Sequence, residues 1–227
     1  MARHLITERD VLDCLKKGSK ELLVDPGTII TPSAKDAAIQ HGIHLRSSSD
    51  VPGHPAPTVV TVSVSQPTGG DPGKSPGTIA FGADHGGYRL KEILKTYVAE
   101  MGFSVADVGT HSEEACDYPD FAFAVASLVT SGQAVRGIMI DGVGVASSIV
   151  ANKVPGIRAV PCYDEFVARS SREHNDANVL TLGGRIVGSE LAKSIVKVWL
   201  GTPYGGGRHQ ARVGKIADIE KRFSSAK

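Results

Sequence analysis

The chain has 227 residues, enough for one well-packed core and a smaller appendage. Its 25 lysines and arginines almost balance its 24 aspartates and glutamates, so the net charge of +1 offers no broad basic surface to nucleic acid or to an anionic membrane. No segment approaches the ~20 apolar residues of a membrane span, and the N-terminus lacks the apolar run of a secretory signal. We therefore expect a cytoplasmic protein, and the three widely spaced cysteines predict neither a disulfide framework nor a zinc site.

Residues 1–46 form a predicted small α+β module. Thr31 or Ser33 is expected to cap a helix that runs to about Gln40, because a hydroxyl before a helix accepts a free backbone N–H. Gly42 should then end that helix.

Residues 47–77 are rich in proline, glycine and serine and contain almost no large apolar side chain beyond valine. This composition is typical of a flexible linker. Within it, residues 58–65 (TVVTVSVS) alternate in a way that also permits a short strand.

Residues 78–227 alternate between apolar runs and amphipathic segments. Five buried strands separated by helices predict a parallel five-stranded sheet with helices on both faces, a three-layer α/β sandwich of the Rossmann-like type. In such sheets, ligands bind at the carboxyl ends of the strands. We expect strands at 78–82, 104–108, 137–141, 157–160 and 178–182, with helices at 88–101, about 121–131, a short one running toward 152–153, and others from near 164, at 189–200 and at 208–223.

Polar, glycine-rich segments follow the first and third of these strands. Asp84 and His85 stand among glycines, which suits either a polar ligand or a purely structural turn. Asp141 ends the third strand, and Gly142 and Gly144 precede a short predicted helix, whose exposed N–H groups can hold a phosphate or stabilise an enediolate oxygen. The segment matches neither the dinucleotide fingerprint nor the P-loop.

Two further polar segments lie near the ends of predicted helices. His174 stands between a helix and the last strand, where it can terminate the helix or shuttle protons near neutral pH. Arg208 and Arg212 follow three glycines and share one helix face, so they can grip a phosphate, the alternative being a solvated basic face.

Six segments in order resemble the type B ribose-5-phosphate isomerases and their galactose-6-phosphate isomerase relatives. They are GADHGGYRLK, DYPDFA, the strand and loop ending in ANK, GIRAV, EHNDANVLTLGGRIVG and GGGRHQARV, within residues 77–223. The resemblance implies an aldose–ketose isomerase that interconverts ribose 5-phosphate and ribulose 5-phosphate through a cis-enediol without metal or other cofactor. It also implies a homodimer or a dimer of dimers with sites shared between subunits.

The resemblance assigns roles to matching positions. His174 would open the sugar ring, while Asp84 and Asn175 would position sugar oxygens. The remaining pocket positions are His85, Arg185, Arg208 and Arg212, which would hold the phosphate, together with Tyr118 and His209.

The loop after the third strand departs from the family pattern. One branch has a cysteine base where this chain has Asp141, and another has a glutamate base at the position of Ser147. We expect Asp141 to be the base, particularly if burial raises its pKa, although N–H groups at a helix start would favour its ionised form and weaken it. Val143 also replaces a family hydroxyl, for which Ser147 or Ser148 can substitute.

Two alternatives to a ribose-5-phosphate isomerase remain open. The absence of both standard bases favours a non-catalytic subunit that binds sugar phosphates or acts as a scaffold. The pocket residues do not fix the number of carbons, so a hexose or deoxy sugar phosphate is a further candidate substrate.

Residues 1–46 are absent from ordinary members of the isomerase family. Their stretch from ITERDV to HGIHL, with the core TPSAKDAA, resembles N-terminal segments of bacterial microcompartment enzymes, including the ethanolamine-utilisation corrinoid adenosyltransferase. The resemblance implies an enzyme inside a microcompartment that binds shell or cargo proteins through this module. The alternative is a small accessory domain that aids assembly.

Overall fold

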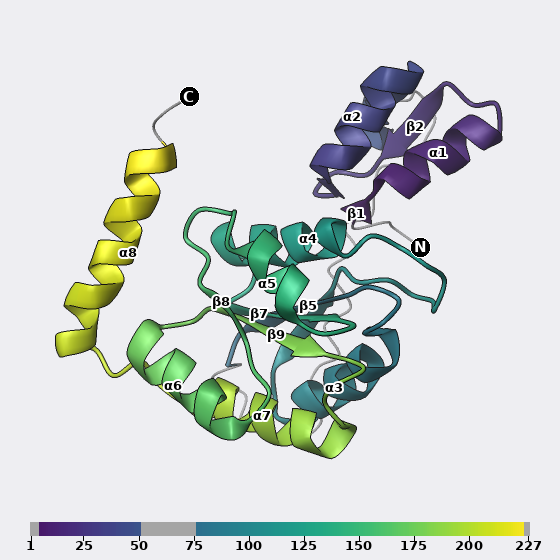
Figure 1. Ribbon diagram of the computed structural model, residues 1–227. Helices are drawn as coiled ribbons and strands as arrows, with labels where there is room; N and C mark the ends of the chain where they lie inside the picture. Colours follow the sequence, from purple (N-terminus) through teal and green to yellow (C-terminus); the bar gives the residue numbers. More distant parts are fainter. Residues whose placement is uncertain (1–4, 51–75, 225–227) are drawn as a thin grey trace. The chain divides into compact units, whose positions relative to one another are not determined.

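The computed structural model describes residues 5–50 and 76–224, and the chain divides into two compact units, Met1–Val64 and Ser65–Lys227 (Figure 1). The possible strand at 58–65 and most of the expected linker lie outside the described residues. Within the described ranges, no helix is both long enough and apolar enough to cross a membrane.

The first unit is a small α+β module whose strands pair in two parallel couples, β1 with β3 and β2 with β4. Ile6, Val11 and Ile43 are buried in its core. Its elements are β1 (Leu5–Ile6), α1 (Glu8–Lys16), β2 (Glu21–Val24), β3 (Ile29–Ile30), α2 (Pro32–His41), β4 (His44–Ser47) and a short 3-10 turn at Ser48–Asp50.

The structure shows which of the two candidates, Thr31 or Ser33, caps α2. Thr31 lies in the extended conformation and its hydroxyl accepts the backbone N–H of Ala34 at 3.2 Å, so Thr31 is the cap rather than Ser33. Gly42 has a φ of 64° and ends the helix in the left-handed region that glycine adopts at little cost.

The second unit is a five-stranded parallel sheet in the order β6-β5-β7-β9-β8, with α4 and α5 on one face and α3, α6 and α7 on the other (Figure 1). The predicted three-layer α/β sandwich is confirmed. The strands are β5 (Thr78–Ala83), β6 (Ser104–Asp107), β7 (Arg136–Asp141), β8 (Ala159–Pro161) and β9 (Val179–Gly183). The helices are α3 (Tyr88–Glu100), α4 (Tyr118–Thr130), α5 (Val145–Ala151), α6 (Glu165–Asn175), α7 (Ser189–Gly201) and α8 (Arg208–Ser224).

The core lies on both faces of the central strands. Ile138 and Met139, which point to opposite faces of β7, are both fully buried, as expected for parallel strands covered by helices on both sides. The predicted boundaries need only small corrections: α4 begins at Tyr118 rather than near residue 121, because Pro119 fits the first helical turn, where its missing N–H costs nothing. The strand expected at 157–160 begins at Ala159.

Helix α8 differs from the other helices of this unit, because none of its residues is buried among the described part of the chain. Ile216, Ile219 and Phe223 are exposed and stand three and four residues apart, so they form one apolar face. The helix contacts α6, and Figure 1 shows it standing away from the sheet.

Candidate active site

The loop between β7 and α5 is organised around the carboxylate of Asp141, which is 4% exposed. Its Oδ1 accepts the N–H groups of Val143, at 2.7 Å, and Gly144. Its Oδ2 accepts the N–H of Ser147, at 2.9 Å, and the Ser147 hydroxyl. Four donors from one short segment therefore converge on a single side chain.

These contacts decide the electrostatics of Asp141. Burial alone would raise its pKa, but the hydroxyl of Ser147 and the N–H groups of Gly144, Ser147 and Val143 outweigh burial and lower the pKa. The pKa of Asp141 is therefore not raised, although a raised pKa would make Asp141 a stronger base. As expected from the sequence for N–H groups at a helix start, these donors favour the ionised carboxylate.

The hydroxyl groups of Ser147 and Ser148 both already donate a hydrogen bond. Ser147 donates to Asp141, and the Ser148 hydroxyl donates to the carbonyl of Ala159 at 3.1 Å. Both serines are buried. To replace the hydroxyl missing at Val143, either serine would first have to give up this bond.

Asp84 lies beside this loop, just after β5. Its Oδ1 accepts the N–H groups of Gly86 at 2.8 Å and Gly87 at 3.1 Å. Burial raises the pKa of Asp84, and the negative charge of Asp141 adds to the rise, while the two N–H groups and His85 oppose it. Two neighbouring carboxylates thus have pKa values shifted in opposite directions.

The glycines of the strand tips permit close backbone approach. An added Cβ at Gly144, whose φ is 90°, would lie 2.9 Å from the carbonyl carbon of Leu182. At Gly142 the nearest atom to an added Cβ would be Cδ of Arg185, at 3.7 Å. The Arg185 N–H also donates to the Gly142 carbonyl at 3.1 Å, so Arg185 stands beside the Asp141 loop.

Two other predicted residues frame this edge. Nδ1 of His85 accepts the N–H of Cys116 at 3.3 Å, and Tyr118 is the first residue of α4. Tyr163, which was not among the residues predicted from the sequence, follows β8 and donates its hydroxyl to the Val143 carbonyl at 3.2 Å. Its position three residues beyond the strand expected at 157–160 was the signal that could have found it.

A second group of predicted residues gathers where α6 ends and α8 begins. The rings of His174 and His209 are stacked, with centroids 4.3 Å apart and planes 11° from parallel. Partial burial, the charges of His174 and of the neighbouring Arg208 and Arg212 all lower the pKa of His209. Asn175 is the last residue of α6, so it belongs to the same group.

The two groups lie at opposite edges of the sheet within one chain. Helix α6 follows β8 and precedes β9, and these two strands are parallel, so α6 starts near the carboxyl edge and ends near the amino edge. His174 is in its last turn, whereas Asp141 is at the carboxyl end of β7. A single chain therefore does not bring His174 to Asp141.

The chain is a parallel α/β sandwich with acidic and guanidinium side chains at its strand tips, the edge at which proteins of this class bind small polar ligands. Residues 79–216 match the family model described as Ribose/Galactose Isomerase, so the chain belongs to this family. The predicted class of enzyme, a sugar-phosphate isomerase, is thereby confirmed.

Individual relatives agree with this assignment. Ribose-5-phosphate isomerase B of Escherichia coli K12 is 53% identical over 144 residues, which are 63% of this chain and 97% of that protein. D-erythrulose-4-phosphate isomerase of Pectobacterium atrosepticum is 40% identical over 144 residues, 63% of this chain and 95% of that protein. The structure of Clostridium thermocellum ribose-5-phosphate isomerase B has 53% identity and a TM-score of 0.64, and the match covers 64% of this chain and 99% of that chain.

Proposed function

We propose that the chain interconverts ribose 5-phosphate and ribulose 5-phosphate through a cis-enediol. The observation that carries the proposal is the pair of buried carboxylates, Asp84 and Asp141, held by glycine N–H groups at the strand tips of a chain 53% identical to the Escherichia coli enzyme. In this proposal Asp141 moves the proton between the two sugar carbons, and Arg185 lies close enough to its loop to hold the phosphate end of the substrate.

The opposite pKa shifts of the two carboxylates support distinct roles. Asp141, with a lowered pKa, is ionised at neutral pH, as a base must be before it accepts a proton. Asp84, with a raised pKa, is the better carrier of a proton for a sugar oxygen. Pairs of titratable groups whose surroundings separate their pKa values in this way are typical of acid–base sites.

A non-catalytic sugar-phosphate-binding subunit is the second candidate. It is favoured by the four hydrogen bonds that already occupy both oxygens of Asp141, because a carboxylate so stabilised is a weak base. The two candidates differ in whether Asp141 exchanges a proton with substrate carbon.

The test is a coupled assay on ribose 5-phosphate, erythrulose 4-phosphate and galactose 6-phosphate, run with wild type, Asp141→Asn and Asp141→Cys. An isomerase should turn over one substrate and incorporate solvent deuterium at the substrate carbon. Asp141→Asn should lose turnover and keep ligand binding, while Asp141→Cys, which restores the base of one family branch, should retain turnover. Binding without turnover in both wild type and Asp141→Cys would establish the second candidate.

We also propose a homodimer whose sites combine strand tips of one subunit with the His174 and His209 group of the other. Support comes from the placement of these groups at opposite edges of the sheet in one chain and from the apolar face of α8, which is exposed among the described residues and which a second copy can bury. A dimer of dimers remains compatible with the same sites.

Complementation tests the shared site directly. Asp141→Asn and His174→Gln should each be inactive alone, whereas subunits of the two variants mixed after reversible dissociation should form heterodimers with one intact site. A one-to-one mixture should recover about a quarter of wild-type turnover, because half of the dimers regain one of two sites. No recovery in verified heterodimers would refute a site that combines Asp141 of one subunit with His174 of the other.

We propose that the N-terminal unit targets the enzyme to a bacterial microcompartment by binding shell or cargo proteins. It has a core of its own, and Ile39 on α2 is 81% exposed, which suits contact with a partner. Deleting residues 1–46 should release the enzyme from the organelle without abolishing turnover, and Ile39→Asp should weaken localisation. An unaltered distribution of the deletion variant would leave the accessory-domain interpretation.

A further inference from the structure

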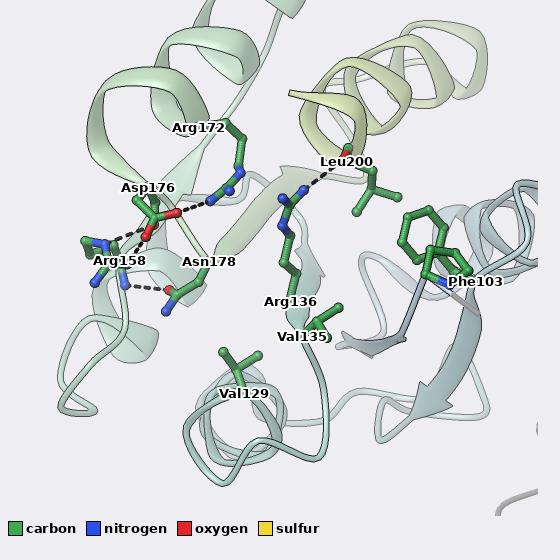
Figure 2. Close-up of a pocket in the computed structure, with 10 residues that line it drawn as sticks. Phe103, Val129, Val135, Arg136, Arg158, Arg172, Asp176, Asn178 and Leu200 are labelled. Atoms are coloured by element: carbon green, nitrogen blue, oxygen red, sulfur yellow. Dashed lines mark hydrogen bonds and ion pairs between the residues drawn. The ribbon is translucent and has the colours of Figure 1, made fainter. Parts of the chain in front are cut away.

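A cavity of about 630 Å³ lies at the amino edge of the sheet in the second unit. Figure 2 shows basic side chains from β7, from α6 and from the segment before β8 around this place, with Arg158 and Arg172 directed toward Asp176 and Arg136 toward Leu200. The basic side chains are Arg136, Arg158 and Arg172, and the apolar wall includes Phe103, Val135 and Leu200.

The charges that line this cavity do not balance. Among the described lining residues, Asp176 is the one carboxylate, and it already pairs with Arg158 at 2.9 Å and with Arg172 at 2.8 Å. Arg136 donates instead to the carbonyls of Trp199 at 3.1 Å and Leu200 at 2.9 Å at the end of α7. Three guanidinium groups thus face one carboxylate, leaving an excess of positive charge.

The burial of these groups makes the excess costly. Burial, followed by the positive charge of Arg172, lowers the pKa of Arg136 to about 10, with Asp176 opposing the shift. Arg172 is 5% exposed, and its Nε, although buried, donates to no acceptor within the described residues. A buried donor without a partner destabilises the folded chain, and a bound acceptor would remove that cost.

The ring of Trp199 lies near the guanidinium groups of both Arg136 and Arg172. The guanidinium carbons of Arg136 and Arg172 lie 5.5 and 5.9 Å from the centroid of its ring. The Trp199 ring is fully buried, and its Nε1 also has no acceptor among the described residues. The arrangement holds both guanidinium groups in place beside the cavity.

We propose that this cavity binds a small organic anion, a phosphate monoester or a carboxylate, whose charged end contacts Arg136 and Arg172 and whose apolar part lies against Val135 and Leu200. The ligand would supply the negative charge that the lining lacks. Guanidinium groups suit either anion, because their planar donors match two oxygens of a phosphate or of a carboxylate.

This site is separate from the strand-tip loop. Arg136 and Asp141 stand at opposite ends of β7, five residues or about 16 Å apart at ~3.3 Å per residue. Arg172 and His174 are two positions apart on α6, about 200° around the helix axis, so they face different directions. The proposal therefore does not depend on the isomerase chemistry.

The test is calorimetric titration of the full chain with phenyl phosphate, benzoate and inorganic phosphate. Phenyl phosphate or benzoate should bind more tightly than inorganic phosphate, because each adds an apolar contact. Val135→Glu should weaken binding about tenfold by placing a negative charge beside the guanidinium groups, whereas the neutral Val135→Gln, at the same 54% exposed position, should weaken binding much less, because it loses apolar contact but adds no charge.

Two further variants locate the binding. Arg136→Gln should weaken binding while turnover is retained, and Arg208→Gln, which belongs to the other predicted group, should leave it unchanged. Equal affinity in Val135→Glu and Val135→Gln would overturn the proposal. So would binding that is lost in Arg208→Gln and kept in Arg136→Gln, since that result assigns the ligand to the substrate pocket.

Discussion

Ser147 donates both its backbone N–H and its hydroxyl to Oδ2 of Asp141, so one residue of α5 supplies half of the hydrogen bonds that this carboxylate accepts. The relationship is local, because the two residues lie six positions apart across the turn from β7 into the helix. It ties the protonation of Asp141 to the start of α5.

Removing the hydroxyl should change the pH dependence of the reaction. The Ser147 hydroxyl lowers the pKa of Asp141, so Ser147→Ala should raise that pKa and move the acidic limb of kcat/KM to higher pH. Ser147→Cys is a matched control of similar size with a weaker donor, and its shift should be intermediate. A profile unchanged in Ser147→Ala would show that the acidic limb reports another group.

A buried ion pair at the tip of β6 should govern acid stability. Lys91 is fully buried and its Nζ donates to both oxygens of Asp107, at 2.9 and 2.7 Å. Burial would raise the pKa of Asp107, but Lys91 and Lys95 outweigh it and lower the pKa. The stability that Asp107 contributes is therefore fully present above its unfolded pKa of about 3.9 and lost as pH falls through the lower folded value.

Lys91→Met should remove that contribution. It should cost about 3–5 kcal/mol at pH 7, because it leaves the Asp107 carboxylate buried with less compensation. Urea unfolding at pH 7 and below pH 4 measures both effects, and the difference between variant and wild type should shrink in acid. A difference that stays constant with pH would mean that packing of the Lys91 stem, rather than its charge, matters. Lys193→Met, on an exposed pair with Glu190, is the control expected to change little.

The stacking of His174 on His209 leads to a prediction for the pKa of His209. The pKa of His209 is lowered by its partial burial and then by the charge of His174, so His209 should be neutral at pH 7. NMR titration of His209 should show a midpoint below about 6.5, and His174→Gln should move it upward. A midpoint that does not move would exclude His174 as a cause of the shift.

Sequence patterns predicted the sheet well because its central strands are buried on both faces and so appear as continuous apolar runs, as at Arg136–Asp141. They could not decide whether Thr31 or Ser33 caps α2, since that choice depends on which hydroxyl reaches the Ala34 N–H. The pKa of Asp141 was beyond prediction because burial and four hydrogen bonds act in opposite directions. The arginine cavity was missed since its members come from separate segments with no shared spacing.

The two glycines of the Asp141 loop offer a matched pair of substitutions. Gly144 has a φ of 90°, and an added Cβ would meet the Leu182 backbone at 2.9 Å, so Gly144→Ala should strain the loop by about 1–3 kcal/mol and displace the N–H that Asp141 accepts. Gly142→Ala meets only the flexible Arg185 side chain, at 3.7 Å, and has no such φ. We expect Gly144→Ala to lower both the free energy of unfolding and kcat, and Gly142→Ala to preserve stability. Equal losses of stability in the two variants would contradict the steric argument, since only Gly144 has backbone in the way.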